Sequence, residues 1–287
     1  MSWYAITDPK DPKLDELAGM FNFHPLHVED ARNPDERPKA ERTDDYLFVI
    51  LKALSFTGDN EAHLSSLSMF VGIDFLITVC NDEVASSLAL ARAHRAGTDQ
   101  KPGTLFYFIF DDLVDSYFNA IDKFSDHVDE LQDRVLDAPG PAVVQEIFDH
   151  KRVLSEVRRS LVNIRDVCIY VQREAGSLID EGLHPYFRDI YDHIIRNLDS
   201  VEMERDLLTS TLDVYLSSVA NRTNEVMKVL TVVSTVALPC LVISSIYGMN
   251  VKGIPFLDSP YGMLYVALMM AATTAILLII LKKFRWL

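Results

Sequence analysis

Two uncharged apolar runs near the C-terminal end constrain this chain more than any other feature of its sequence. No Asp, Glu, Lys or Arg occurs from Val229 to Ile246, and none occurs from Tyr261 to Leu281. A helix needs about 20 apolar residues to cross the hydrocarbon core of a bilayer, and both runs approach or reach that length. The sequence therefore predicts a C-terminal transmembrane hairpin over residues 226–287, with Gly248 and Asn250 at its turn.

Basic residues around the two runs predict how the hairpin is oriented. Arg222 and Lys228 lie before the first run, the loop carries only Lys252, and three cations follow the second run at Lys282, Lys283 and Arg285. By the positive-inside rule, both ends of the chain face the cytoplasm and the loop faces outward. The first 17 residues show no basic segment followed by an apolar one, so no signal peptide is expected. We expect a multi-pass protein of the plasma (inner) membrane.

Charge and cysteine usage narrow the classes of function. The formal net charge of -15 argues against nucleic acid, because phosphate binding needs concentrated Lys and Arg. The same charge is compatible with a surface that binds cations. No GxxxxGK loop occurs, so no nucleotide partner is expected. Cys80, Cys168 and Cys240 are far apart, which indicates free thiols and neither a disulfide framework nor a cysteine zinc site.

The part before the hairpin divides into an α/β domain over residues 1–98 and a helical domain over residues 99–225. In the first domain we expect helices at Leu14–Phe21 and Pro25–Ala31 and another at Val84–Ala96. Runs of β-branched and aromatic residues predict strands at Tyr46–Leu51, Leu64–Val71 and Phe75–Cys80. The whole chain is then an α+β membrane protein, with an N-terminal cytosolic domain, a long helical stalk and two transmembrane helices.

The helical domain is expected to contain two helices and the start of a third. Apolar residues at three- and four-residue spacing predict helices over Leu105–Leu136 and Val143–Ala175. Neither Gly nor Pro occurs between Tyr186 and Pro239, so the third helix has no reason to end before the first apolar run is complete at Ile246. About 60 helical residues make a stalk of about 90 Å.

Two transmembrane helices in one chain cannot enclose an aqueous path. A conduit would therefore require several copies in a ring, with one helix from each copy lining the axis. The first apolar run is the better candidate for the lining, since it and the residues before it place Asn224, Thr231, Ser234 and Ser245 on a roughly common side. The second run is nearly uniform and suits contact with lipid.

Several motifs, in their order along the chain, resemble the CorA family of divalent-cation channels. They are His24-Pro25-Leu26, Glu29-Asp30, Arg37-Pro38-Lys39, Tyr186-Phe187-Arg188-Asp189, Leu212 to Ser218, Arg222 to Lys228, Tyr247-Gly248-Met249-Asn250, and the ending Lys282 to Leu287. This resemblance covers nearly the whole chain. It implies a homopentameric channel for Mg2+, with Co2+ or Ni2+ as further ions, and a funnel-shaped cytoplasmic sensor.

The resemblance assigns an ion path to particular residues. Gly248, Met249 and Asn250 match the selectivity filter, where a ring of Asn amides would hydrogen-bond the water shell of a hydrated Mg2+. Pore-lining positions match Asp213, Asn224, Met227, Leu230 and Leu238. Met227 and Leu230 would form a gate that closes by dewetting. Simple packing is the alternative role for these two apolar residues.

The resemblance also implies feedback by cytosolic Mg2+. Asp30 matches a carboxylate that faces a second carboxylate, Asp189, on the neighbouring subunit, and Glu29 and Asp111 match further ligands. Opposed carboxylates repel one another when empty and are drawn together by a bridging divalent cation. Loss of Mg2+ would loosen the ring and open the gate through the long helix.

An enzymatic alternative starts from the same N-terminal residues. His24, His27, Glu29 and Asp30 crowd into seven residues, as the ligands of a hydrolytic metal site could. The cluster lacks a metalloenzyme spacing such as HExxH, and His24 before Pro25 suits the start of a helix. We therefore expect no catalytic residue and no enzyme.

Two features depart from the pattern of the magnesium members of the family. Ile254-Pro255-Phe256-Leu257 stands where an acidic loop sequence is frequent, and Gly253-Ile254-Pro255 is similar to the ZntB zinc transporters. Cys240 would favour Zn2+ or Co2+ if it faced the axis, although packing is its simpler role. A ZntB-type Zn2+ transporter and a membrane-anchored cation sensor that conducts nothing remain the alternatives.

Overall fold

The computed structural model describes residues 2–57, 61–80, 101–137, 140–251, 253–256, 259–284 and 286. The chain forms two compact units, Met1–Asp213 and Val214–Leu287. The divisions expected from the sequence after residues 98 and 225 stay predictions. The helix expected at Val84–Ala96 lies outside the described residues.

A five-stranded sheet forms the base of the first unit, with the strand order β1-β5-β4-β3-β2. Its strands are β1 (Ser2–Ile6), β2 (Lys39–Arg42), β3 (Tyr46–Thr57), β4 (Glu61–Gly72) and β5 (Phe75–Cys80). Only β1 and β5 pair in parallel, and the other neighbours are antiparallel. The sequence predicts the three inner strands and misses both edge strands, because β1 and β2 are short and carry no continuous apolar run.

Both faces of the sheet are covered, which explains the unbroken apolar run of β3. Tyr46, Phe48 and Ile50 pack in a cluster with residues of two short helices, α1 (Lys13–Met20) and α2 (Pro25–Arg32). Successive strand residues point to opposite faces, yet the intervening side chains of β3 are also fully buried. Helix α4 (Pro102–Asp137) covers that other face, and the Tyr117 hydroxyl donates a hydrogen bond to the Lys52 carbonyl over 2.9 Å.

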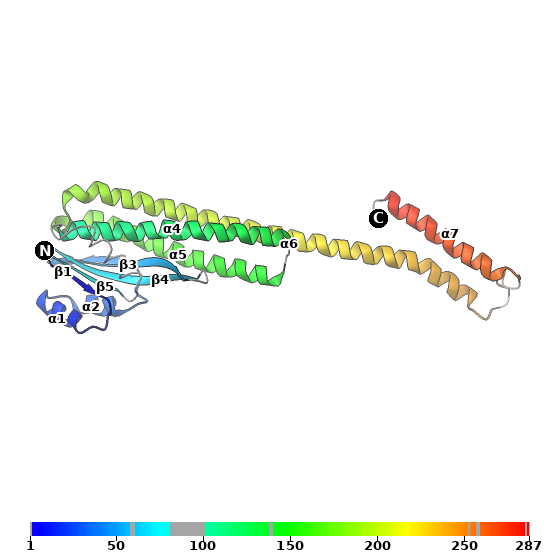
Figure 1. Ribbon diagram of the computed structural model, residues 1–287, viewed down its shortest axis with the longest axis horizontal. Helices are drawn as coiled ribbons and strands as arrows, with labels where there is room; N and C mark the ends of the chain where they lie inside the picture. Colours follow the sequence, from blue (N-terminus) through cyan, green and yellow to red (C-terminus); the bar gives the residue numbers. More distant parts are fainter. Residues whose placement is uncertain are drawn as a thin grey trace. The chain divides into compact units, whose positions relative to one another are not determined.

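Three long helices lie side by side in the first unit (Figure 1). Helix α5 (Pro141–Glu174) runs antiparallel to α4, since Tyr117 bonds Ser160 at 2.7 Å and Arg134 bonds Glu146 at 2.8 Å. Helix α6 runs parallel to α4. The Asn197 side chain of α6 donates a hydrogen bond of 3.2 Å to the Val114 carbonyl of α4. Farther along both helices, Glu204 of α6 accepts a bond of 2.7 Å from Ser125 of α4.

Helix α6 spans His184–Tyr247 without interruption and contains Pro239. It crosses the division between the two units, as the absence of Gly and Pro predicts. Helix α7 spans Gly262–Lys283. Two helical segments, Glu181–Tyr247 and Gly262–Lys283, are long and apolar enough to cross a membrane, and their most apolar windows are not buried within the chain. Both predicted transmembrane helices are therefore present as candidate spans.

Cys168 and Cys240 each lie against a neighbouring helix. Cys168 is buried between α5 and α6, where its thiol lies 3.4 Å from the Phe187 carbonyl. Burial raises the pKa of Cys168 to about 11, so the thiol stays protonated at neutral pH and is a poor metal ligand. In the second unit, Cys240 Sγ lies 3.4 Å from Thr274 Oγ1 of α7. This contact supports the packing role expected for Cys240.

Candidate metal sites and ion path

The Gly248-Met249-Asn250 sequence forms the turn that ends α6. The Gly248 amide donates to the Ser244 carbonyl over 2.9 Å, and the Met249 amide donates to Ile246 over 3.3 Å. A Cβ atom at Gly248 would lie 3.1 Å from the Ser244 carbonyl oxygen, which is tighter than ordinary contact. Glycine therefore lets the last helical turn close directly before Asn250.

Asn250 and Met249 are exposed at the end of this turn within the single chain. The loop continues through two residues with positive φ, Gly253 at 93° and Phe256 at 64°. The ring of Phe256 packs against Tyr265 of α7, with 5.3 Å between the ring centroids. The amide of Asn250 is thus held on a short loop that is attached to both spans.

The residues assigned to the ion path share one side of α6. At about 100° per residue, they fall within an arc of about 120° around the helix axis. All of them are exposed in the single chain, namely Asp213, Asn224, Met227, Leu230 and Leu238. Most neighbouring residues of α6 are exposed in the single chain as well, and apolar side chains on a candidate span also suit lipid. The assignment of this stripe to an ion path therefore stays a prediction.

A compact group of possible metal ligands lies between α4 and α6. One ligand atom each of Asp111, Asp115 and His193 lies within 4.8 Å of the others. His193 Nδ1 is 3.5 Å from Asp115 Oδ1, and its Nε2 is 3.7 Å from Asp189 Oδ2. Two of the four predicted regulatory residues, Asp111 and Asp189, therefore belong to one neighbourhood.

The donor set of this α4–α6 cluster fits a divalent cation. Mg2+ prefers carboxylate oxygens and keeps several of its waters, which suits half-buried Asp111 and exposed Asp115. The imidazole of His193 is a ligand for Co2+, Ni2+ and Zn2+ as well. Asp189 is 63% exposed, so it can also reach a ligand from outside its own chain.

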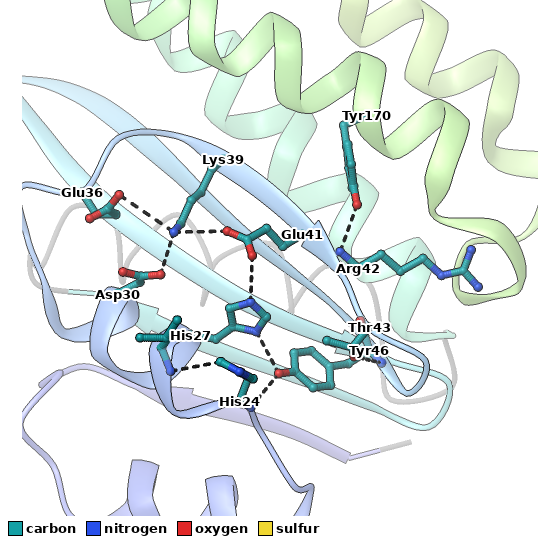
Figure 2. A network of polar contacts seen from close by, with 11 residues as sticks. His24, His27, Asp30, Glu36, Lys39, Glu41, Arg42, Thr43, Tyr46 and Tyr170 are labelled. Carbon is teal, nitrogen blue, oxygen red and sulfur yellow. Dashed lines mark hydrogen bonds and ion pairs between the residues drawn. The ribbon is translucent and has the colours of Figure 1, made fainter.

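The other two predicted regulatory residues lie on α2, and Asp30 belongs to a separate polar network. Lys39 is at the centre of this network (Figure 2), with its ammonium 2.6 Å from Asp30, 3.3 Å from Glu41 and 4.0 Å from Glu36. Glu29 is exposed beside Asp30. Within one chain, then, Asp30 is neutralised by a lysine nine residues away.

The charges of this Lys39 network are stabilised by one another. Partial burial disfavours charged Lys39, but hydrogen bonds to Asp30 and Glu41 outweigh that effect and raise its pKa. Partial burial likewise disfavours charged Glu41, but hydrogen bonds with His27 and Lys39 outweigh it and lower the pKa of Glu41. Lys39 and Glu41 are therefore both ionised at neutral pH.

The two histidines of the same segment have structural roles. His24 caps α2, where its Nδ1 accepts a bond of 3.3 Å from the Leu26 amide. Buried His27 lies 2.8 Å from the Tyr46 hydroxyl and 3.2 Å from Glu41 (Figure 2). This arrangement explains the His-rich segment as the start of α2 and its attachment to the sheet.

Several residues of these two clusters were missed from the sequence. Asp115 and His193 complete the α4–α6 cluster, and Lys39 pairs with Asp30 and also contacts Glu36 and Glu41. A signal existed for the first pair, since Asp111 and Asp115, like Asp189 and His193, are four residues apart on one helix face. Nothing in the spacing of Lys39 points to Asp30, because a turn and the start of β2 separate them.

These features define a class of protein: a membrane protein with two candidate spans, whose sheet-and-helix unit carries carboxylate clusters suited to divalent cations. The family model described as "CorA-like Mg2+ transporter protein" matches residues 1–283. The chain belongs to this family, and it is a divalent cation transporter, not an enzyme.

Individual relatives agree with this assignment. The chain is 34% identical to the cobalt/magnesium transport protein CorA of Thermotoga maritima, over 100% of this chain and 83% of the relative. The complete structure of the CorA magnesium transporter from Methanocaldococcus jannaschii matches with a TM-score of 0.88 and 26% identity, over 99% of this chain and 91% of that chain. The fold class predicted from the sequence is thereby confirmed.

A zinc-transporter relative is more distant. The ZntB cytoplasmic domain from Vibrio parahaemolyticus matches with a TM-score of 0.63 and 14% identity, over 76% of this chain and 88% of that domain. At this level of identity the match shows the fold alone. The comparisons therefore favour the CorA interpretation over the ZntB interpretation of the Gly253-Ile254-Pro255 segment.

Proposed function

We propose that this protein is a channel through which Mg2+, and with it Co2+ or Ni2+, enters the cytoplasm. The observation that carries the proposal is the 34% identity, over the whole chain, to a relative named as a cobalt/magnesium transport protein. The exposed Gly248-Met249-Asn250 turn at the end of α6 supports it. In this proposal both chain ends are cytoplasmic and the loop after Asn250 faces outward, in the plasma (inner) membrane.

The conducting form in this proposal is a homopentamer with α6 around the axis. Five Asn250 amides at the entrance bind the water shell of the hydrated ion, which a neutral ring can also release. Asp213, Asn224, Met227, Leu230 and Leu238 face the path. A divalent ion that moves down an inside-negative potential gains about 4.6 kcal/mol per 100 mV, from about 2.3 kcal/mol for each charge. The membrane potential is therefore a sufficient driving force.

Feedback by cytosolic Mg2+ completes the proposal. The α4–α6 cluster of one subunit, with Asp189 at its edge, receives Asp30 and Glu29 from the neighbouring subunit. Bound Mg2+ bridges these carboxylates and holds the ring closed, and its loss lets them repel one another. The separate locations of Asp30 and Asp189 within one chain are compatible with a meeting between chains.

The function is tested by ion flux into liposomes that contain the purified protein under an inside-negative potential. Mg2+, Co2+ and Zn2+ are offered separately, and the internal concentration is followed with an ion-sensitive dye. Entry of Mg2+ that rises with the potential is the expected result. Zn2+ entry that follows a pH gradient, with little Mg2+ movement, would favour the ZntB alternative. A change of conformation with Mg2+ but no flux of any ion would favour the non-conducting sensor.

Lys39 gives a prediction about the sensitivity of the feedback. Its ammonium holds Asp30 at 2.6 Å, so a bridging Mg2+ must displace it. In Lys39→Met the competing cation is gone, and we expect half-inhibition of flux at an internal Mg2+ concentration lower by about 3- to 10-fold, which is about 0.7–1.4 kcal/mol and within the net contribution of one ordinary hydrogen bond. The measurement is flux into liposomes loaded with graded Mg2+.

Lys101→Met is the matched control for this measurement. Lys101 makes an ion pair of the same length, 2.6 Å, with Asp180, away from the α2 network. Its removal should leave the inhibition curve in place. If Lys39→Met instead weakened inhibition, Lys39 would have to position Asp30 for the bridge and not compete for it.

A further inference from the structure

One flank of the three-helix bundle is acidic. Four carboxylates lie along α4 beyond the α4–α6 cluster, and at about 100° per residue they and the cluster residues Asp111 and Asp115 fall within an arc of about 60°. All four are exposed, and we call them the acidic flank: Asp122, Asp126, Asp129 and Asp133. This arc borders α6, because the neighbouring position Ser125 bonds Glu204. The acidic flank is therefore on the α4–α6 side of the bundle.

A second flank, where α5 meets α6, contains a pocket rich in arginine. This arginine pocket has a volume of about 290 Å3 and is lined by Ser155, Arg158, Arg159, Val162, Asn163 and Arg205. Glu202 accepts bonds from Arg158 over 3.0 Å and from Arg205 over 2.9 Å. Glu202 thus pairs with two of the three arginines, and Arg159 lines the same pocket as a third cation, in a chain whose net charge is -15.

A second observation marks this pocket as incomplete. Among the residues that the structure describes, the buried Nε atom of Arg205 finds no hydrogen-bond partner. Buried polar atoms are nearly always paired, and an Arg guanidinium matches a carboxylate in planar geometry. The enclosed Nε atom is out of reach of another copy, whereas Arg158 and Arg159 are exposed at the same pocket and are the groups that a further carboxylate can reach.

Helix register places the two charged surfaces at the same height along the bundle. Tyr117 on α4 is level with Ser160 on α5, and Arg134 is level with Glu146. Residues 155–160 of α5, which carry the pocket, are therefore level with about residues 117–123 of α4, at the low-numbered end of the acidic flank. Across the pocket, Arg158 bonds Glu202, so Arg205 of α6 is level with the same turns.

We propose that the acidic flank of one copy docks on the arginine pocket of the next copy, with Asp122 and Asp126 beside Arg158 and Arg159. This inference rests on the ring of the proposed function. In a closed ring with its axis along α6, all copies have the same position along the axis. Each interface then joins two different surfaces of neighbouring copies, and those surfaces must lie at the same position along the axis. Exposed ion pairs add little affinity individually, and the complementary charge instead selects which faces meet.

Cysteine cross-linking in the full-length protein tests this contact. In detergent, the double variant Asp122→Cys/Arg159→Cys is expected to form a covalent ladder up to the size of the ring under mild oxidation, because each copy carries one half of each pair. Each single variant carries only one half, and it controls for the native Cys80, Cys168 and Cys240. A ring of wild-type mass without a ladder would overturn the docking but leave the proposed function intact. A monomer by native mass measurement would overturn both.

Charge reversal provides a second, independent test. Arg158→Glu/Arg159→Glu should shift the dilution at which the ring dissociates by at least about tenfold, since like charges at an interface oppose association. Adding Asp122→Lys/Asp126→Lys to the same chain should restore the ring. Arg165→Glu is the matched control, because Arg165 pairs with adjacent Asp166 on α5 and is not part of the pocket. Equal dissociation of all variants, or failure of the second pair to rescue the first, would contradict the proposal.

Discussion

Asn250→Ala is expected to lower Mg2+ flux by at least about tenfold. The Asn250 side chain lies exposed directly after the last turn of α6, where each copy would present one amide to the hydrated ion. Hydrogen bonds to charged groups contribute about 1.5–3 kcal/mol each, and alanine removes one from every subunit at once. The measurement is the initial rate of Mg2+ entry into liposomes under a fixed inside-negative potential.

Controls separate this loss from misfolding. Asn119→Ala removes an exposed amide from α4, away from the loop, and should keep the wild-type rate. The purified Asn250→Ala protein should keep the wild-type mass and melting temperature, because the side chain is exposed and its loss opens no cavity in the core. Flux by Asn250→Ala at the wild-type rate would remove Asn250 from the ion path and, with it, the selectivity filter as proposed.

The strong elements of the fold could be predicted from the sequence, and the edges of the sheet could not. Strand β3 is found from Tyr46–Leu51 because a sheet covered on both faces requires an unbroken apolar run. Strand β2 has the sequence Lys39-Ala40-Glu41-Arg42, and Lys, Ala and Glu are residue types that occur in strands less often than average. It is a strand because it pairs with β3, with Lys39 opposite Ile50, and because its charged side chains find partners on α2. Tertiary contacts decided this element.

The candidate metal site was predictable in part for a similar reason. The family resemblance gives Asp111 and Asp189, but Asp115 and His193 join them only because α4 and α6 run parallel and adjacent. Spacing within each helix gives the pairs, and only the packing of the helices brings the pairs together. Lys39 was missed because the competing charge lies on a different element from Asp30, and a sequence pattern carries no information on that contact.

The second large effect is expected at the α4–α6 cluster. Asp111→Asn/Asp115→Asn should raise the internal Mg2+ concentration for half-inhibition of flux by at least about tenfold, because two carboxylate ligands are lost and a neutral amide binds Mg2+ poorly. We therefore expect the flux of this variant to stay high as internal Mg2+ rises over the range that inhibits the wild type.

Binding and flux must both be measured for this variant, since a blocked pore would also hide the feedback. Limited proteolysis of the full-length protein over a Mg2+ series reports the closed ring without any transport, and the wild type should be protected as Mg2+ rises while Asp111→Asn/Asp115→Asn is not. Asp44→Asn/Asp45→Asn, which removes the same charge from the exposed turn before β3, should behave as the wild type. Equal protection and equal inhibition in all three proteins would place the regulatory Mg2+ elsewhere, and the Lys39 network around Asp30 would then be the next set of carboxylates to test.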